Sequence, residues 1–309
     1  MALSAAIPMT NAAIGVARAA DLISPALAAR VSAPMFGSSR PVRRVHASER
    51  GVHETASRRP LRLPGGEGVA YEWGSGHRTV LLVHGWRGRA SQFAPIVREL
   101  RAGGYRLVAF DAPAHGDGYG RRTVIRTWID AIDAMHERYG PFEAIVGHSL
   151  GALTAINAVR EGVSAPRVAA IAPVSSGRYL FDAFAGYVGL SERAAEIQRD
   201  RYRERVFSDF EDPWRYFDAV RAPMPPDIEL LLVHDRDDAQ IAASESERLH
   251  AAHGENSRLL LTSGQGHGRV LAADQTLDAV SSFVDGGIAA IDLDEIDEIG
   301  DERVVNSFA

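Results

Sequence analysis

Residues 142–152 read Phe-Glu-Ala-Ile-Val-Gly-His-Ser-Leu-Gly-Ala, and Gly147, Ser149 and Gly151 form the pattern Gly-x-Ser-x-Gly. The three apolar residues before Gly147 predict a short buried strand, and residues 150–161 follow a helical pattern. A serine held in a strained turn needs neighbours without side chains, because otherwise the backbone cannot close. The five-residue pattern is weak alone, but a strand, a sharp turn and a helix in this order indicate a nucleophile elbow. Such an elbow raises the Ser149 hydroxyl above the sheet edge, where the helix N-terminus favours negative charge.

Short apolar runs alternate with helical patterns on both sides of this stretch. Strands that are apolar on both faces and alternate with helices predict an α/β fold with a mostly parallel, doubly wound sheet. The alternation stops after residue 172, and residues 176–222 hold two or three helical patterns rich in aromatic and charged residues. We expect this insertion to be a helical lid, because ligands bind at the carboxyl ends of the strands in such sheets. The expected strands are residues 69–73, 79–83, 106–110, 144–146, 168–172, 228–233 and 259–261.

The two ends of the chain differ in charge from its centre. We expect a basic, partly flexible leader over residues 1–62, the α/β domain over residues 63–285, and an acidic tail over residues 286–309. Nine arginines against three acids give residues 1–63 a charge of +6, and eight acids against one arginine give residues 285–309 a charge of −7. The two ends could attract each other, each could meet a partner, or both could be solvated.

Composition excludes several classes of chemistry. The 309 residues include no cysteine and no lysine, which rules out disulfides, thiolate nucleophiles and lysine Schiff bases. The arginines of the leader are scattered without aromatic residues between them, so we expect no nucleic-acid partner. No stretch is apolar for long enough to span a bilayer. The apolar N-terminus lacks the basic region of a signal peptide and is interrupted at Pro8, Asn11 and Gly15, so we expect a cytoplasmic protein.

Two further strand ends carry the partners that a serine nucleophile needs. A serine hydroxyl is a weak nucleophile until a base takes its proton, and that base needs an acid to orient it. His267 lies between two glycines after the last strand, where its ring could reach Ser149. Residues 233–241 contain three aspartates, of which we expect Asp238 to orient His267, with Asp235 as the alternative. This cluster could instead bind a cation, but it lacks the glycine turn and closing glutamate of a calcium loop.

Taken together, these motifs resemble the α/β-hydrolase superfamily from about Val69 to Asp285, and most of all its uncharacterised, esterase-like bacterial members. The resemblance is carried by His84-Gly85-Trp86, Asp111 to Gly116, the elbow, His234 to Asp238, and Gly266-His267. It implies the α/β-hydrolase fold and places the acid four residues after His234, at Asp238. Asp235 stands where relatives usually have glycine, which keeps the assignment open, and Gly118 stands where many have serine.

The resemblance also implies an oxyanion hole made of two backbone N–H groups, those of Trp86 and Leu150. Four residues are expected to hold loops by hydrogen bonds rather than to catalyse: His84, Asp111, His115 and His148.

These residues together predict acyl transfer on a small-molecule ester or thioester, without a metal or an organic cofactor. Ser149 would attack the carbonyl with His267 as base, and water would then release the acid from the acyl-enzyme. The serine argues against haloalkane dehalogenases and epoxide hydrolases, whose nucleophile in this fold is an aspartate. The alternatives are cofactor-independent acyl transfer by the same residues and a non-catalytic protein that uses the pocket as a receptor.

Aromatic residues of the insertion are expected to form an apolar lid over the acyl pocket, although they could instead anchor the lid to the body. They are Tyr179, Phe181, Phe184, Tyr187 and Trp214. Trp86 narrows the space beside the oxyanion loop, which favours small or medium acyl groups.

Overall fold

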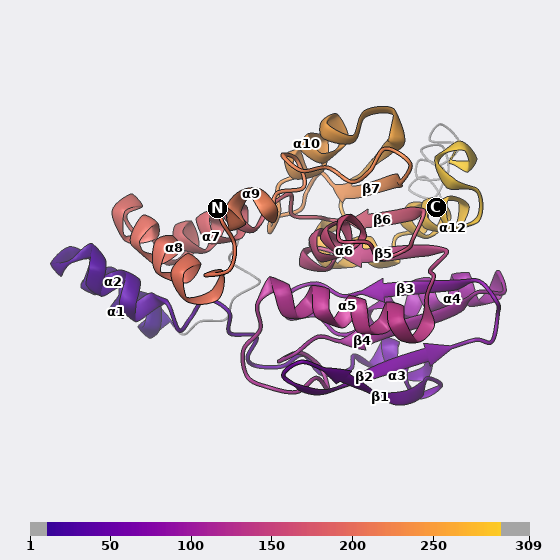
Figure 1. Cartoon of the computed structure of the whole chain (residues 1–309), viewed down its shortest axis with the longest axis horizontal. Coiled ribbons are helices and arrows are strands. Elements are labelled where there is room, and N and C mark those ends of the chain that lie inside the picture. The colour runs from indigo at the N-terminus through magenta and orange to yellow at the C-terminus, as the bar shows by residue number, and fades with distance from the viewer. Residues whose placement is uncertain (1–10, 292–309) are drawn as a thin grey trace, which may run out of the picture.

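The computed structural model describes residues 11–291, which contain one eight-stranded, mostly parallel sheet (Figure 1). The strands are β1 (Ser57–Leu63), β2 (Gly66–Trp73), β3 (Thr79–Val83), β4 (Arg106–Asp111), β5 (Ala144–His148), β6 (Arg167–Ile171), β7 (Glu229–Asp235) and β8 (Ser257–Thr262). Their order in the sheet is β1-β2-β4-β3-β5-β6-β7-β8. β2 pairs antiparallel with β1 and β4, and all the other neighbours pair parallel. The predicted α/β architecture is confirmed.

Helices cover both faces of this sheet. One face packs against α5 (Ile125–Tyr139), α6 (Leu150–Arg160) and α10 (Ser244–His253), and the other against α4 (Ala94–Ala102) and α12 (Asp274–Gly286). All five residues of β3 are buried, and the four apolar ones, residues 80–83, alternate between the two cores, which explains the continuous apolar run. The shorter helical turns are η1 (Ala90–Phe93), η2 (Gly254–Asn256), α11 (Gly266–Arg269), η3 (Val270–Ala272) and η4 (Gly287–Ala290).

The insertion between β6 and β7 is helical, as predicted. It contains α7 (Gly177–Val188), α8 (Glu192–Val206) and α9 (Pro213–Tyr216), which lie beyond the carboxyl end of β6 (Figure 1). Ser191 caps α8, because its Oγ accepts a hydrogen bond of 3.2 Å from the backbone N–H of Ala194. The insertion therefore lies at the edge of the sheet where the sequence predicted the functional site.

The sheet begins earlier than the predicted boundary between leader and body. β1 occupies residues 57–63, and all of these except Leu63 lie in the range expected for the leader. Sequence reasoning missed it because it contains three arginines and a proline, and only Leu61 is buried. The seven residues of β1 thus lack the alternation of apolar and polar residues that marks a strand.

Residues 11–56, also expected to belong to the leader, contain three helices. They are α1 (Asn11–Ile23), α2 (Pro25–Ser32) and α3 (Ala47–Glu54). α1 and α2 lie beside α7 and α8 at one end of the molecule (Figure 1). Arg18 Nε donates to the carbonyl of Val188 at 2.8 Å, and Asp21 accepts hydrogen bonds from the backbone and hydroxyl of Ser191 at 2.5 and 2.8 Å. These helices and the insertion therefore form one layer.

Residues 1–10 and 292–309 lie outside the part of the chain that the structure describes. Three predictions concern these residues in whole or in part. They are the absence of a signal peptide at the N-terminus, the acidic tail, and the contact between the two charged ends. Within residues 11–291, no helix is both long enough and apolar enough to cross a membrane.

Candidate active site

The backbone around Ser149 forms the strained turn that the sequence predicted. Ser149 joins β5 to α6 with φ 56° and ψ −120°, a conformation that residues with a side chain rarely adopt. A Cβ atom on Gly147 would lie 2.5 Å from Cα of Ala152, and one on Gly151 would lie 2.2 Å from the carbonyl oxygen of Val83. Both glycines are therefore required by the close approach of the helix to the strands.

Asp238 is the aspartate that contacts the ring of His267. Its Oδ2 lies 2.7 Å from Nδ1 of His267 and 3.3 Å from Nε2 of His234. Its Oδ1 accepts hydrogen bonds from the backbone N–H groups of Gln240 at 2.7 Å and Ile241 at 3.1 Å. Burial alone would raise the pKa of this carboxyl, but the hydrogen bonds from His234 and His267 outweigh it and lower the pKa well below its ordinary value. Asp238 is thus an ionised acceptor that fixes the orientation of the His267 ring.

Asp235, the alternative acid, fixes the loop that carries His267 instead. Its Oδ1 accepts from the backbone N–H of Gly266 at 2.9 Å, and its Oδ2 accepts from Gln265 N–H at 3.0 Å and from the Thr262 hydroxyl at 2.8 Å. Burial acts to raise the pKa of Asp235, but these hydrogen bonds lower it overall. This supporting role was not predicted, although an aspartate at the end of a strand beside a glycine-rich turn is a recognisable signal for it.

An apolar pocket of about 130 Å³ brings the predicted residues together. Ser149, His267, Trp86 and Leu150 all line it. From the insertion it is lined by Leu180, Phe181, Phe184, Tyr202, Phe207 and Trp214, among others. Ser149 follows β5 and His267 follows β8, and both strands end at this edge of the sheet.

Two of the aromatic residues proposed for the lid lie elsewhere. Tyr179 and Tyr187 are on α7 but are not among the residues that line the pocket. The Tyr179 hydroxyl accepts a hydrogen bond of 3.4 Å from the backbone N–H of Ala242, and Tyr187 packs against the cluster that joins α1 to α7. On an amphipathic helix, only one stripe can face the pocket, and these two residues anchor the other sides.

The His84-Gly85-Trp86 segment lies directly against the elbow. A Cβ atom on Gly85 would lie 2.9 Å from Cβ of Ser149 and 2.8 Å from Nδ1 of His148. Leu150 is the first residue of α6, so its N–H belongs to the group that has no acceptor within the helix. The residue before Trp86 therefore lies too close to Ser149, the residue before Leu150, to carry a side chain.

His148 connects the elbow to the loop of His267. Its Nδ1 accepts from the side-chain amide of Gln92 at 3.0 Å, and its Nε2 donates to the backbone carbonyl of His267 at 2.9 Å. Burial lowers the pKa of His148 to about 3, so the ring is neutral and can hold both bonds at once. His148 is thus a positioning residue, as the sequence led us to expect.

His84 and His115 hold neighbouring loops in the same way. His84 donates from Nδ1 to the carbonyl of Gly85 at 2.8 Å and accepts at Nε2 from the N–H of Ala112 at 3.0 Å. His115 Nδ1 lies 3.0 Å from the carbonyl of Pro113. Burial lowers the pKa of His84 to about 4 and that of His115 to about 3.

These three buried histidines predict a loss of stability in mild acid. Unfolding returns each ring to water, where its pKa is about 6.5, so below that pH the unfolded chain binds more protons than the folded one. Their contribution is constant above pH 6.5 and falls as the pH drops towards the folded pKa values of about 3 to 4. The free energy of unfolding should decrease by up to about 1.4 kcal/mol per pH unit for each ring.

Denaturant titrations at pH 7.5, 6.5, 5.5 and 5 measure this slope above the range where most carboxylates titrate. His148→Gln should reduce the slope of the unfolding free energy against pH by up to about 1.4 kcal/mol per pH unit, the value for one proton. The same substitution at the exposed His77 is the control and should leave the slope unchanged. An unfolding free energy that stays constant from pH 6.5 to 5 would contradict the prediction.

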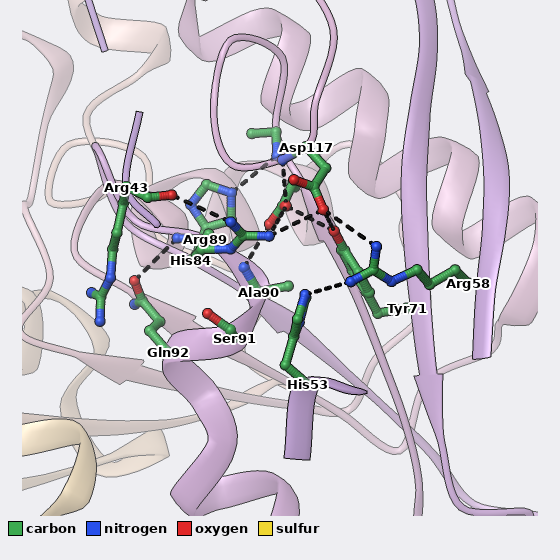
Figure 2. Close-up of polar contacts among 12 residues, drawn as sticks. Arg43, His53, Arg58, Tyr71, His84, Arg89, Ala90, Ser91, Gln92 and Asp117 are labelled. Atoms are coloured by element: carbon green, nitrogen blue, oxygen red, sulfur yellow. Dashed lines mark hydrogen bonds and ion pairs between the residues drawn. The ribbon is translucent and has the colours of Figure 1, made fainter. Parts of the chain in front are cut away.

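A buried polar network joins α3 to the loops that follow β3 and β4, and Figure 2 shows Arg89, Tyr71 and Asp117 converging in it. Asp111 is its centre and accepts from the N–H groups of Ala90 and Asp117, both at 2.7 Å. Its Oδ2 also accepts from the Tyr71 hydroxyl at 3.0 Å and lies 3.4 Å from the guanidinium of the buried Arg89. Asp111 therefore holds its own loop, as expected, but the arginine that neutralises it was not predicted.

Residues from the N-terminal segment also line the pocket, which sequence reasoning missed. Met35, Phe36, Gly37 and Ser38 contribute to its wall. The ring of Phe36 lies 3.8 Å from that of Phe181 and 5.2 Å from that of Phe184, centroid to centroid. A signal was present, because Phe36 is the one aromatic residue among the first 70.

Comparisons with known proteins agree with this architecture. The model of the Alpha/beta hydrolase family matches residues 80–297, more than two thirds of the chain. The chain belongs to the alpha/beta hydrolase family. No curated protein has significant sequence similarity to it.

Several solved structures share the fold. The esterase Pf2001 of Pyrococcus furiosus is 19% identical, with a TM-score of 0.60 over 79% of this chain and 97% of that one. A bacterial membrane phospholipase A is 18% identical, with a TM-score of 0.57 over 89% and 96%. The thioesterase domain from the curacin biosynthetic pathway is 17% identical, with a TM-score of 0.54 over 74% and 99%. At these identities, the similarity establishes the fold alone.

Proposed function

We propose that this protein is a serine hydrolase that cleaves a carboxylic ester or thioester through an acyl-enzyme. The observation that carries the proposal is the pairing of Asp238 with His267 at 2.7 Å, beside a pocket that Ser149 and His267 both line. An ionised carboxylate, an imidazole that it orients and a serine in a strained elbow are the parts that acyl transfer requires.

The reaction follows from these groups. His267 takes the proton of the Ser149 hydroxyl as its oxygen attacks the carbonyl carbon, and a tetrahedral intermediate forms. The backbone N–H groups of Trp86 and Leu150 stabilise the negative charge on the carbonyl oxygen. His267 then gives its proton to the departing alcohol or thiol, and the acyl group stays on Ser149. In the second half, His267 takes a proton from water as the water oxygen attacks the acyl-enzyme. His267 then returns this proton to the Ser149 oxygen as its bond to the acyl carbon breaks and the acid departs.

The pocket supports an acyl substrate with an apolar group. Its lining is dominated by aromatic and aliphatic side chains, and its volume of about 130 Å³ favours small or medium acyl groups. Esterases, a thioesterase domain and a phospholipase A share the fold, and all three names describe cleavage of acyl esters or thioesters. Residues Phe181 and Phe184 are proposed to contact the acyl chain.

Labelling by a fluorophosphonate tests the nucleophile directly. We expect one label per chain, on Ser149, because only a serine activated by a base reacts rapidly with such a probe. Peptide mass spectrometry identifies the labelled residue, and a panel of p-nitrophenyl esters from acetyl to dodecanoyl measures the preferred acyl length. Labelling of the exposed Ser263, or none at all, would favour a non-catalytic binding protein over a hydrolase.

A further inference from the structure

A second cavity, of about 640 Å³, adjoins the pocket on the side of the N-terminal helices. The two share six lining residues, which are Phe36, Gly37, Thr123, Val124, Phe181 and Tyr202. The two cavities therefore meet at the Phe36 segment, α7, α8 and the residues before α5. The second cavity lies between α2 and α8, on the far side of Phe36 from Ser149.

The charge of this cavity is strongly positive. Arg30, Arg122, Arg201 and Arg205 line it, and none of its described lining residues is acidic. Within residues 11–291, none of the four has a carboxylate within ion-pair distance, whereas Arg193 and Arg199 on the same helix α8 pair with carboxylates at 3.0 and 2.7 Å. Clustered cations without counter-charges repel one another, so an anion in this cavity would relieve the repulsion.

A buried polar group adds a second recognition element. The side chain of Gln198 is 3% exposed and lines the cavity, and its Nε2 donates to the hydroxyl of Ser32 at 3.1 Å. That bond fixes the amide, yet its Oε1 has no hydrogen-bond partner among the described residues. A buried acceptor without a donor is unfavourable, and it suits a ligand that carries an N–H or O–H group beside its anion.

We propose that this cavity binds the phosphate group of an acyl ester or thioester whose carbonyl reaches Ser149. A guanidinium group binds phosphate through two parallel hydrogen bonds to two of its oxygens. Four arginines around a space this large therefore fit a phosphate better than a single carboxylate. The chain that links the phosphate to the reacting carbonyl then runs along the residues that the two cavities share, and the apolar pocket holds the acyl group. The inference rests on the proposed function, and it narrows the substrate to a phosphate-bearing acyl compound.

Two phosphate-bearing substrates and their neutral counterparts test this assignment. Octanoyl-coenzyme A is compared with S-octanoyl-N-acetylcysteamine, which has the same thioester without phosphate, and dioctanoyl phosphatidic acid with dioctanoylglycerol. In Arg122→Gln/Arg205→Gln protein, kcat/KM for the phosphate-bearing member of one pair should fall roughly 10- to 100-fold, mainly through KM. The neutral member should be unaffected, and the pair that responds identifies the source of the phosphate.

Arg203→Gln is the matched control, because Arg203 is exposed on α8 between two of the cavity arginines but does not line the cavity. It should change neither member of either pair. Equal losses on charged and neutral substrates, or no loss on either phosphate-bearing substrate, would overturn the proposal while leaving the hydrolase assignment intact.

Calorimetric titration of the wild-type protein with free coenzyme A and with glycerol 3-phosphate gives a readout that does not depend on turnover. Binding of either that weakens about tenfold in the double variant but not in Arg203→Gln would support the cavity even if every ester assay failed. Binding that is absent, or equal in all three proteins, would refute it.

Discussion

Replacing Ser149 by alanine is expected to lower ester hydrolysis by about 10⁴- to 10⁶-fold while leaving the fold intact. The change removes one oxygen atom from a side chain that is 6% exposed and keeps the Cβ atom that contacts the His84-Gly85-Trp86 loop. Without that oxygen no acyl-enzyme can form, and only the slow attack of water on a bound substrate remains.

The measurement compares initial rates on the best p-nitrophenyl ester with circular dichroism and the thermal midpoint of the same preparation. Ser263→Ala is the control, because Ser263 is exposed on the loop that leads to His267 but lies outside the pocket lining. It should retain full activity. Turnover close to that of the wild type in Ser149→Ala, with an unchanged fold, would remove the mechanism.

The features that the sequence predicted well depend on short-range constraints. Buried parallel strands need apolar residues on both faces, so β3 to β7 appear as continuous apolar runs in the sequence. The elbow needs glycine at two positions because a Cβ atom there would clash with backbone atoms of β3 and α6. Such constraints can be recognised from single residues and their spacing.

The choice between Asp235 and Asp238 could not be made in this way. Asp235 is the last residue of β7 and Asp238 comes three residues later. Their separate contacts depend on a tight turn in which the Asp238 N–H donates to the carbonyl of Asp235. The turn directs one carboxylate to the ring of His267 and the other to the backbone of its loop. Only the three-dimensional path of two loops separated in sequence by about 30 residues distinguishes these contacts.

The N-terminal contribution to the pocket was hidden by its composition. The residues that α1 and α2 bury are mostly alanines, Ala17, Ala20, Ala28 and Ala29, and small side chains give a weak apolar pattern. Their partners are on α7 and α8, which lie more than 150 residues away in sequence. Because this packing is long-range and involves small residues, the sequence predicted a leader where the structure has part of the pocket wall.

Replacing Asp238 by asparagine is expected to lower kcat by about 10⁴-fold while the turn that holds this residue remains folded. An asparagine amide at this position would donate to Nδ1 of His267, which now lies 2.7 Å from a carboxylate oxygen. The ring would then carry its proton on Nε2, where it could no longer accept the proton of Ser149. The oxygen that accepts from Gln240 and Ile241 would be retained, so the turn should survive.

Asp235→Asn is the matched comparison, because it makes the same chemical change three residues away. An amide there would place N–H groups against the donors that Asp235 now accepts from, such as Gln265 N–H and the Thr262 hydroxyl. We expect a loss of about 1–3 kcal/mol in the free energy of unfolding and a smaller fall in kcat. Denaturant titration and kcat measured on both variants separate the two roles. A large fall in kcat at normal stability for Asp235→Asn, together with nearly full activity for Asp238→Asn, would show that the acid had been assigned to the wrong residue.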